Sequence, residues 1–198
     1  MAPPEAMQFG ETLPRLLQAL AFAYLTYMPV YLAKHNLSDG FCQLHLSLNS
    51  ILPLAVLPPT PPSEAPLVAL PLAVTMGWIR APPSFCTTTE TATDLANWSI
   101  GAGESLEPHH LEQRVDPSPT TEEGKVAYLL APKEYTSPPL SLVDDIIGTT
   151  QGDTQQGLNI TGAILHSVDK VFQPLEPDDI PKRQEPVSLK ELDKGDSR

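Results

Sequence analysis

Apolar residues recur at helical spacing in two stretches, near the beginning of the chain and in its last third. In the first stretch Thr12 can cap a helix start, so we expect a helix from Thr12 to about residues 24–27. Its apolar face consists of Leu13, Leu16, Leu17, Leu20 and Ala21. The second stretch predicts a helix over residues 155–172. A third helix is expected over residues 84–98, because Pro82-Pro83 suits a first helical turn, although threonines lower its propensity.

Shorter apolar runs along the chain predict strands. Residues 29–33 form one such run. Residues 41–46 alternate in polarity, the period-two pattern of a strand with one buried face. Residues 51–57 and 67–74 are apolar runs on either side of a proline-rich segment, which predicts a hairpin with a long loop.

Proline is unusually frequent, with 23 residues among 198. So much proline limits regular structure and predicts long irregular connections. Residues 101–139 are charged, contain proline and show little periodicity, so we expect this segment to be mostly disordered, with one short strand at residues 125–130. The polar residues 173–198 predict a disordered tail.

The chain is acidic, with 12 basic and 24 acidic residues and a formal net charge of -12. A nucleic-acid-binding protein normally carries a basic face, so we expect weak binding to phosphate backbones by this chain alone. The apolar residues 16–33 are interrupted by Gln18 and Pro29, and no basic signal-peptide region precedes them. We therefore expect an intracellular protein with no signal peptide and no membrane-spanning segment.

Two adjacent acids, Asp144 and Asp145, lie between the short apolar arms 140–143 and 146–149. Carboxylates on a turn between two buried strands are held rigidly at the edge of a sheet. Such a pair can bind Mg²⁺, which prefers oxygen ligands, and a pair of such ions serves phosphoryl transfer. The alternative interpretation is a solvated turn, because aspartate is common in turns.

Three segments resemble, in order, the motifs of one polymerase family. Residues 35–41 look like its first catalytic motif, in which Asp-Leu is followed by Gly and an aromatic residue. Residues 70–85 are similar to its Leu-Pro-x-Gly and Pro-x-x-Phe segment, and residues 142–145 to its Tyr-x-Asp-Asp box. The chain thus resembles the reverse transcriptases (RNA-directed DNA polymerases) of gypsy-type LTR retrotransposons, with residues 101–139 as an insertion.

The resemblance implies roles for individual residues. Asp144 and Asp145 would ligate catalytic Mg²⁺. Phe41 would pack under the sugar of the incoming nucleotide and disfavour a 2′-hydroxyl. Met76 would lie near the nucleotide, and Gly77 would permit close backbone approach. The implied partner is an RNA or DNA template-primer.

One departure from the family pattern bears directly on activity. The position of the first catalytic aspartate is occupied by Asn36, which is neutral and a poorer Mg²⁺ ligand than a carboxylate. Asp39 lies three residues later and would serve only if the turn were rebuilt. Leu142 replaces the aromatic residue of the box. The resemblance therefore implies a family member that does not polymerise.

The expected fold is α+β, an incomplete reverse-transcriptase palm in which a small antiparallel sheet packs on helices, with long disordered segments. Residues 1–100 would form part of the fingers and palm, and residues 101–139 the disordered acidic insertion. Residues 140–172 would form the palm hairpin and its following helix, and residues 173–198 the disordered tail.

An alternative function remains open: a non-enzymatic acidic protein whose proline-rich loops bind partners. Residues 58–62 offer a polyproline II stretch, the form that several recognition domains bind. An untranslated or decayed element also fits the sequence. Separately, His109-His110 lies among Glu104, Glu107 and Glu112, which suggests either a weak metal site or a solvated loop.

Overall fold

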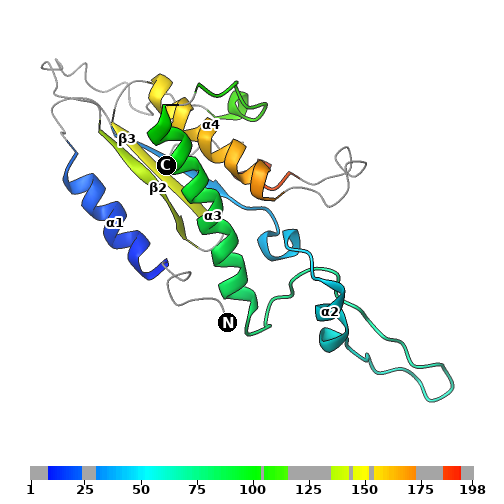
Figure 1. Cartoon of the computed structure of the whole chain (residues 1–198). Helices are drawn as coiled ribbons and strands as arrows, with labels where there is room; N and C mark the ends of the chain where they lie inside the picture. The colour runs from blue at the N-terminus through cyan, green and yellow to red at the C-terminus, as the bar shows by residue number, and fades with distance from the viewer. Residues whose placement is uncertain are drawn as a thin grey trace, which may run out of the picture.

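A three-stranded antiparallel sheet lies at the centre of the protein, for which Figure 1 shows a computed structural model. The strands β1 (Val30–Asn36), β2 (Tyr135–Leu142) and β3 (Asp145–Gln151) lie in the order β1-β3-β2. β2 and β3 are consecutive in the chain, whereas β1 comes from near its beginning. The structure describes residues 9–23, 30–103, 105–115, 135–142, 145–151, 154–172 and 185–192.

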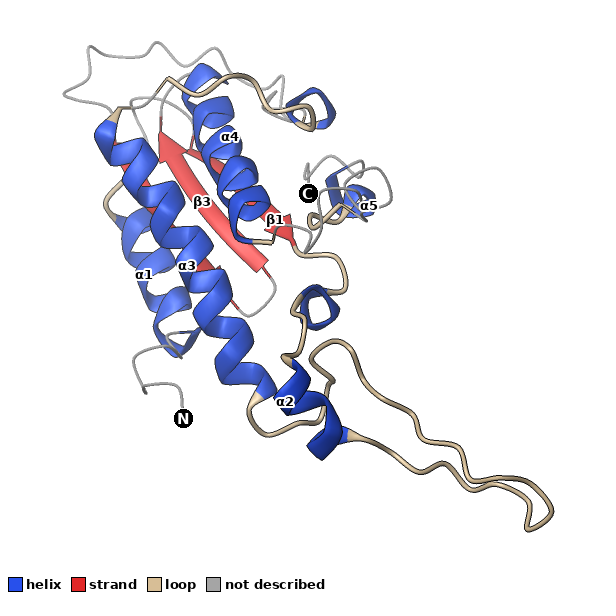
Figure 2. Cartoon of the chain, turned by 45° about the vertical axis from the view of Figure 1, so that its right-hand side comes forward, coloured by secondary structure: helices blue, strands red, loops and turns tan. Residues whose placement is uncertain are grey.

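Two long helices, α3 (Ala81–Ala102) and α4 (Thr154–Val171), pack against each other and cover one face of the sheet (Figure 2). α3 contributes Ala92 and Ala96, whose small buried side chains let the helices approach closely. The core between these helices and β3 is filled by Phe85, Ile146, Ile164, Leu165 and Val168. The fold is thus α+β, a small antiparallel sheet packed on helices, which confirms the predicted class.

The predicted helix over residues 84–98 is confirmed and extends further at both ends. Two prolines occupy its first turn, where a missing N–H costs no helical hydrogen bond. Threonine hydroxyls along α3 donate to carbonyls one turn earlier, for example Thr91 to Thr87 at 2.7 Å and Thr93 to Thr89 at 2.9 Å. Thr89 and Thr93 are also buried. Tertiary packing offsets the low helix propensity of threonine, and these bonds satisfy the hydroxyl groups within the helix.

The edge strand β2 contains an irregularity between Ser137 and Leu140. The two residues between them are Pro138 and Pro139, which have no N–H to donate to the ladder. A strand that carries proline must therefore lie at an edge of the sheet or bulge at that point, and β2 does both.

The first helix, α1 (Phe9–Ala21), lies along β2, on the side away from α4 (Figure 1). Its existence was predicted, but the apolar face that the sequence indicates is not the face that is buried. Thr12 and Ala19 are buried, whereas Leu13 and Leu17 are exposed. Periodicity identifies residues that share a helix face, not the face that meets the sheet. Among the helices that the structure describes, none is long and apolar enough to cross a membrane.

The part of the chain that connects β1 to α3 forms a long arm, which projects from the rest of the protein (Figure 2). Its two sides are joined by reciprocal backbone hydrogen bonds between Val56 and Ala69, at 2.9 and 2.8 Å, as the predicted hairpin requires. The short helices α2 (Leu48–Ile51) and η3 (Leu52–Leu54) occupy the first part of the predicted hairpin arm over residues 51–57, so the prediction is wrong there.

The predicted strand over residues 41–46 is wrong at its beginning. Residues Gly40–Gln43 form a 3₁₀ helix, η2, because Asp39 turns the chain with a φ of 48°. Gly40 then lies so close to the Phe85 ring that a Cβ at this position would overlap it. The prediction is thus wrong for residues 41–43, whereas His45 pairs with Ala73 in an isolated antiparallel bridge.

Two segments that we expected to be disordered contain ordered structure. Residues 105–115 carry the 3₁₀ helix η4 (Glu112–Arg114), and His109 and Leu111 are buried, 5% and 4% exposed. Their burial comes from contact with α4, which lies far away in the sequence. The predicted strand at residues 125–130 lies outside the described residues.

The second segment with unexpected ordered structure is residues 185–192, which belong to the predicted disordered tail. Ser188 N donates to Asn36 O at 2.8 Å, and Ser38 N donates to Pro186 O at 2.8 Å. Val187 pairs with Leu37 and is buried, and the helix α5 (Leu189–Leu192) follows. This segment thus extends the sheet beyond the outer edge of β1.

Candidate active site

The last residue of β1 and the first residue of β3 lie side by side. The antiparallel register pairs Asn36 with Asp145, although 109 positions separate them in the chain. The Asn36 side-chain amide Nδ2 donates to Asp145 Oδ1 at 2.9 Å. A donor must face a carboxylate oxygen, so this contact also fixes which end of the amide points at Asp145.

A lysine engages the other oxygen of the same carboxylate. Lys34 Nζ lies 3.1 Å from Asp145 Oδ2, with the lysine side chain 42% exposed and the aspartate side chain 19% exposed. Lys34 precedes Asn36 by two residues, so both side chains point to the same face of β1. Asp145 is therefore held between a neutral amide and an ammonium group.

His35, between Lys34 and Asn36, points to the opposite face of β1. His35 is buried, and neither ring nitrogen has a hydrogen-bond partner among the described residues. Burial lowers the pKa of His35 to about 4, because a charged ring cannot be solvated there. On β3, Ile146 is buried next to it and anchors the strand on which Asp145 sits.

The backbone of the site is also held from the outer edge of the sheet. The carbonyl of Asn36 accepts the bond from Ser188 N described above. Asn36 is thus fixed on both sides, through its side chain to β3 and through its carbonyl to residues 185–192.

The other residues assigned from the resemblance lie in different settings. Asp144 lies outside the described residues, so its position relative to Asp145 stays a prediction. Phe41, half-buried in η2, stacks on Phe85 with ring centroids 4.6 Å apart. Asp39 is exposed in the turn beyond β1.

Met76 and Gly77 form part of the turn that leads into α3. Met76 is 79% exposed. Gly77 has a φ of 91°, a conformation that favours glycine, and an added Cβ would meet nothing within 4 Å among the described atoms. Backbone conformation, rather than close packing within the described chain, therefore accounts for glycine at this position.

Lys34 was missed in the sequence because the predicted strand ended at Ala33. The one signal in the sequence was that Lys34 and Asn36 are two residues apart, the spacing of one strand face.

The chemistry available at this site follows from its charges. One carboxylate faces one ammonium and one amide, an arrangement that satisfies Asp145 without a metal ion. A divalent cation would have to displace Lys34 and would gain only a neutral oxygen from Asn36. The described residues therefore fit Mg²⁺ poorly.

Comparison with known proteins adds no further assignment to this geometry. The chain matches no model of a protein family, no curated protein and no solved structure.

Proposed function

We propose that the chain is a reverse-transcriptase-like palm of the gypsy-type LTR retrotransposon kind, and that it does not polymerise DNA. The observation that carries the proposal is the pairing of Asn36 with Asp145 across β1 and β3. The resemblance assigns these two positions to one metal site, and such a site requires them to be neighbours in space.

The order of the elements also supports the proposal. The segment that resembles the first catalytic motif ends β1, and the Pro-x-x-Phe segment begins α3. The segment that resembles the Asp-Asp box runs from the last residue of β2 to the first residue of β3. A helix behind the sheet and a hairpin beside the first motif strand are what the resemblance implies for a palm.

Two residues account for the proposed lack of activity. Asn36 removes one of the three carboxylates that the family site would hold. Lys34 places a positive charge 3.1 Å from the carboxylate oxygen of Asp145, where a metal ion would bind. In addition, a net charge of -12 opposes binding of a template-primer by this chain alone.

A primer-extension assay tests the proposed inactivity. The unaltered chain would be incubated with an RNA homopolymer, a complementary DNA primer and dNTP, with Mg²⁺ or Mn²⁺. We expect no incorporation above a sample without protein. Robust incorporation that is lost in an Asp145→Asn variant would overturn the proposed inactivity.

The alternative function, a proline-rich interaction protein, is favoured by one observation. Of the residues 58–62 in the arm, all four prolines are exposed. Exposed polyproline segments bind the aromatic grooves of SH3 and WW domains. Binding of a purified SH3 or WW domain that is abolished by replacing these prolines with alanine would support this alternative. Absence of binding across such domains would remove it.

A further inference from the structure

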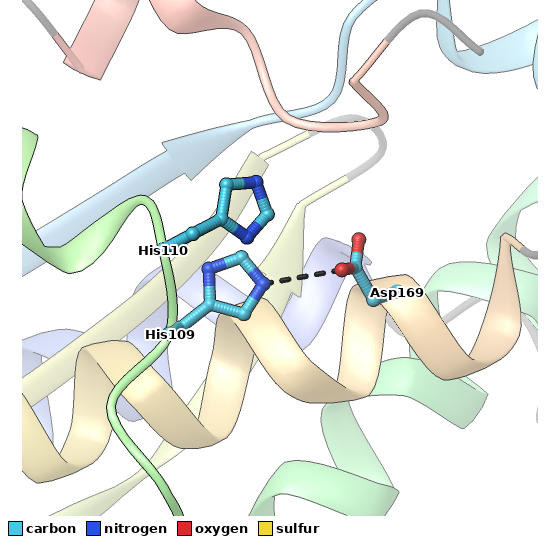
Figure 3. Close-up of side chains that lie close together, drawn as sticks. All are labelled: His109, His110 and Asp169. Carbon is cyan, nitrogen blue, oxygen red and sulfur yellow. Dashed lines mark hydrogen bonds and ion pairs between the residues drawn. The ribbon is translucent and has the colours of Figure 1, made fainter. Parts of the chain in front are cut away.

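A cluster of imidazoles and carboxylates lies away from Asp145, where residues 105–115 cross α4. His109 and His110 come from that segment, and Asp169 comes from the last turn of α4, as Figure 3 shows. Glu185 reaches the cluster from the segment that follows α4 in the chain. Four potential metal ligands thus come from three separate parts of the chain.

The ligand atoms of the cluster lie close together. His109 Nε2 is 3.1 Å from Asp169 Oδ2, and His110 Nε2 is 3.1 Å from Glu185 Oε1. The two imidazole rings have centroids 4.3 Å apart. One ligand atom from each of His109, His110 and Asp169 lies within 4.8 Å of the others.

We propose that His109, His110 and Asp169, with Glu185 as the fourth ligand, bind a Zn²⁺ ion. Zinc bonds of about 2.0–2.2 Å in a tetrahedron place ligand atoms roughly 3.3–3.6 Å from one another. The two imidazole–carboxylate distances of 3.1 Å are already close to that spacing. Among His109, His110 and Asp169 the ligand atoms lie within 4.8 Å of one another, so these three need a contraction of up to about 1.2–1.5 Å.

The two histidines of the cluster differ in their exposure to solvent. The His109 side chain is 3% exposed, whereas the His110 side chain is 59% exposed. The fixed ring is oriented by its own segment, because Leu111 N donates to His109 Nδ1 at 3.2 Å. This bond leaves the proton of the neutral ring on Nε2, facing Asp169.

Zinc binding replaces that proton, so His109 changes tautomer and the bond from Leu111 is lost. The cost of this change lowers the affinity relative to a site whose rings are already oriented for metal. We therefore expect dissociation constants in the micromolar range.

The ion would connect α4 to residues 105–115 and 185–192, the two segments that we had expected to be disordered. Glu185 is adjacent to Pro186, whose carbonyl accepts the bond from Ser38 N beside β1. Zinc would thus hold residues 105–115 and 185–192 in place together. The inference is independent of the proposed palm function, because none of its ligands contacts Asn36 or Asp145 in the contacts that the structure describes.

Calorimetric titration of the full chain with ZnCl₂ tests the site. We expect binding of one ion, a rise in Tm with zinc, and at least about tenfold weaker binding in His110→Ala, because loss of even an outer-shell partner has such an effect. His110 is largely exposed, so this variant should keep the fold. His45→Ala removes an exposed imidazole from the arm and is the matched control.

The outcomes decide the assignment. Zinc binding that is weakened in His110→Ala and unchanged in His45→Ala and Asp145→Asn supports the site. No binding at 100 μM zinc would overturn it, since a site with a dissociation constant of about 1–10 μM would be at least about 90% occupied at that concentration. Binding that is lost in Asp145→Asn and kept in His110→Ala would overturn it too.

Discussion

Lys34 and Asp145 form an ion pair of 3.1 Å across two strands that are distant in the sequence. The amide of Asn36 binds the second oxygen of the same carboxylate. Each oxygen of the Asp145 carboxylate therefore has a partner without a metal ion.

Replacement of Lys34 by methionine should change stability little. The lysine side chain is 42% exposed, so solvent screens the pair, and we expect a loss of no more than about 1 kcal/mol in the free energy of unfolding. Urea denaturation measures this loss. Lys170→Met, at an exposed position of α4, is the matched control. A loss of about 3 kcal/mol or more, specific to Lys34, would instead indicate a fully buried pair.

His35 should make the protein less stable in mild acid. Its pKa is lowered to about 4 in the folded protein and is about 6.5 in the unfolded chain, so the unfolded chain binds more protons between these values. Stability is therefore fully present above pH 6.5 and falls as pH decreases towards 4. The expected loss between pH 7.5 and pH 5 is about 2 kcal/mol.

His35→Leu should reduce this pH dependence and raise stability at every pH, because leucine leaves no unpaired ring nitrogen in the core. Urea denaturation at pH 7.5 and pH 5 gives both quantities. His45→Leu serves as the control, since that imidazole is exposed. An unchanged pH dependence in His35→Leu would show that other groups cause it.

Gly40→Ala should destabilise the protein, because the new Cβ would overlap the Phe85 ring at the centre of the core. Overpacking of this kind costs roughly 1–3 kcal/mol. Gly101→Ala is the matched control in α3: its Cβ meets nothing within 4 Å, and we expect stabilisation of up to about 1 kcal/mol. Equal Tm values for both variants would contradict the described packing of Gly40.

Patterns local to the sequence predicted the long elements well. α3 and α4 follow from helical spacing and from prolines at a helix start, and both lie close to the expected residues. β1 was predicted to end at Ala33 but continues to Asn36, because β3 on one side and residues 185–188 on the other pair with its polar end. Such pairing has no signal in the strand itself.

Contacts between distant segments account for the remaining errors. His109 lies in an acidic, proline-bearing stretch, and its burial depends on α4. Likewise, the buried face of α1 could not be assigned, because it depends on contact with β2 and β3, which lie far away in the sequence. In the candidate site, Asn36 and Asp145 were linked only through the resemblance, and Lys34 was not found at all.

Titration of MnCl₂ or MgCl₂ into variants of Asn36 tests the central claim most directly. Asn36→Asp places a second carboxylate beside Asp145, and Lys34→Met with Asn36→Asp also removes the competing ammonium group. Asn49→Asp, an exposed change in α2, is the control. We expect negligible heat from the unaltered chain and the control, and binding that strengthens at least tenfold in the single and further in the double variant. Unchanged binding in both variants, measured by calorimetry on folded protein, would contradict the assignment of Asn36 and Asp145 to a former metal site.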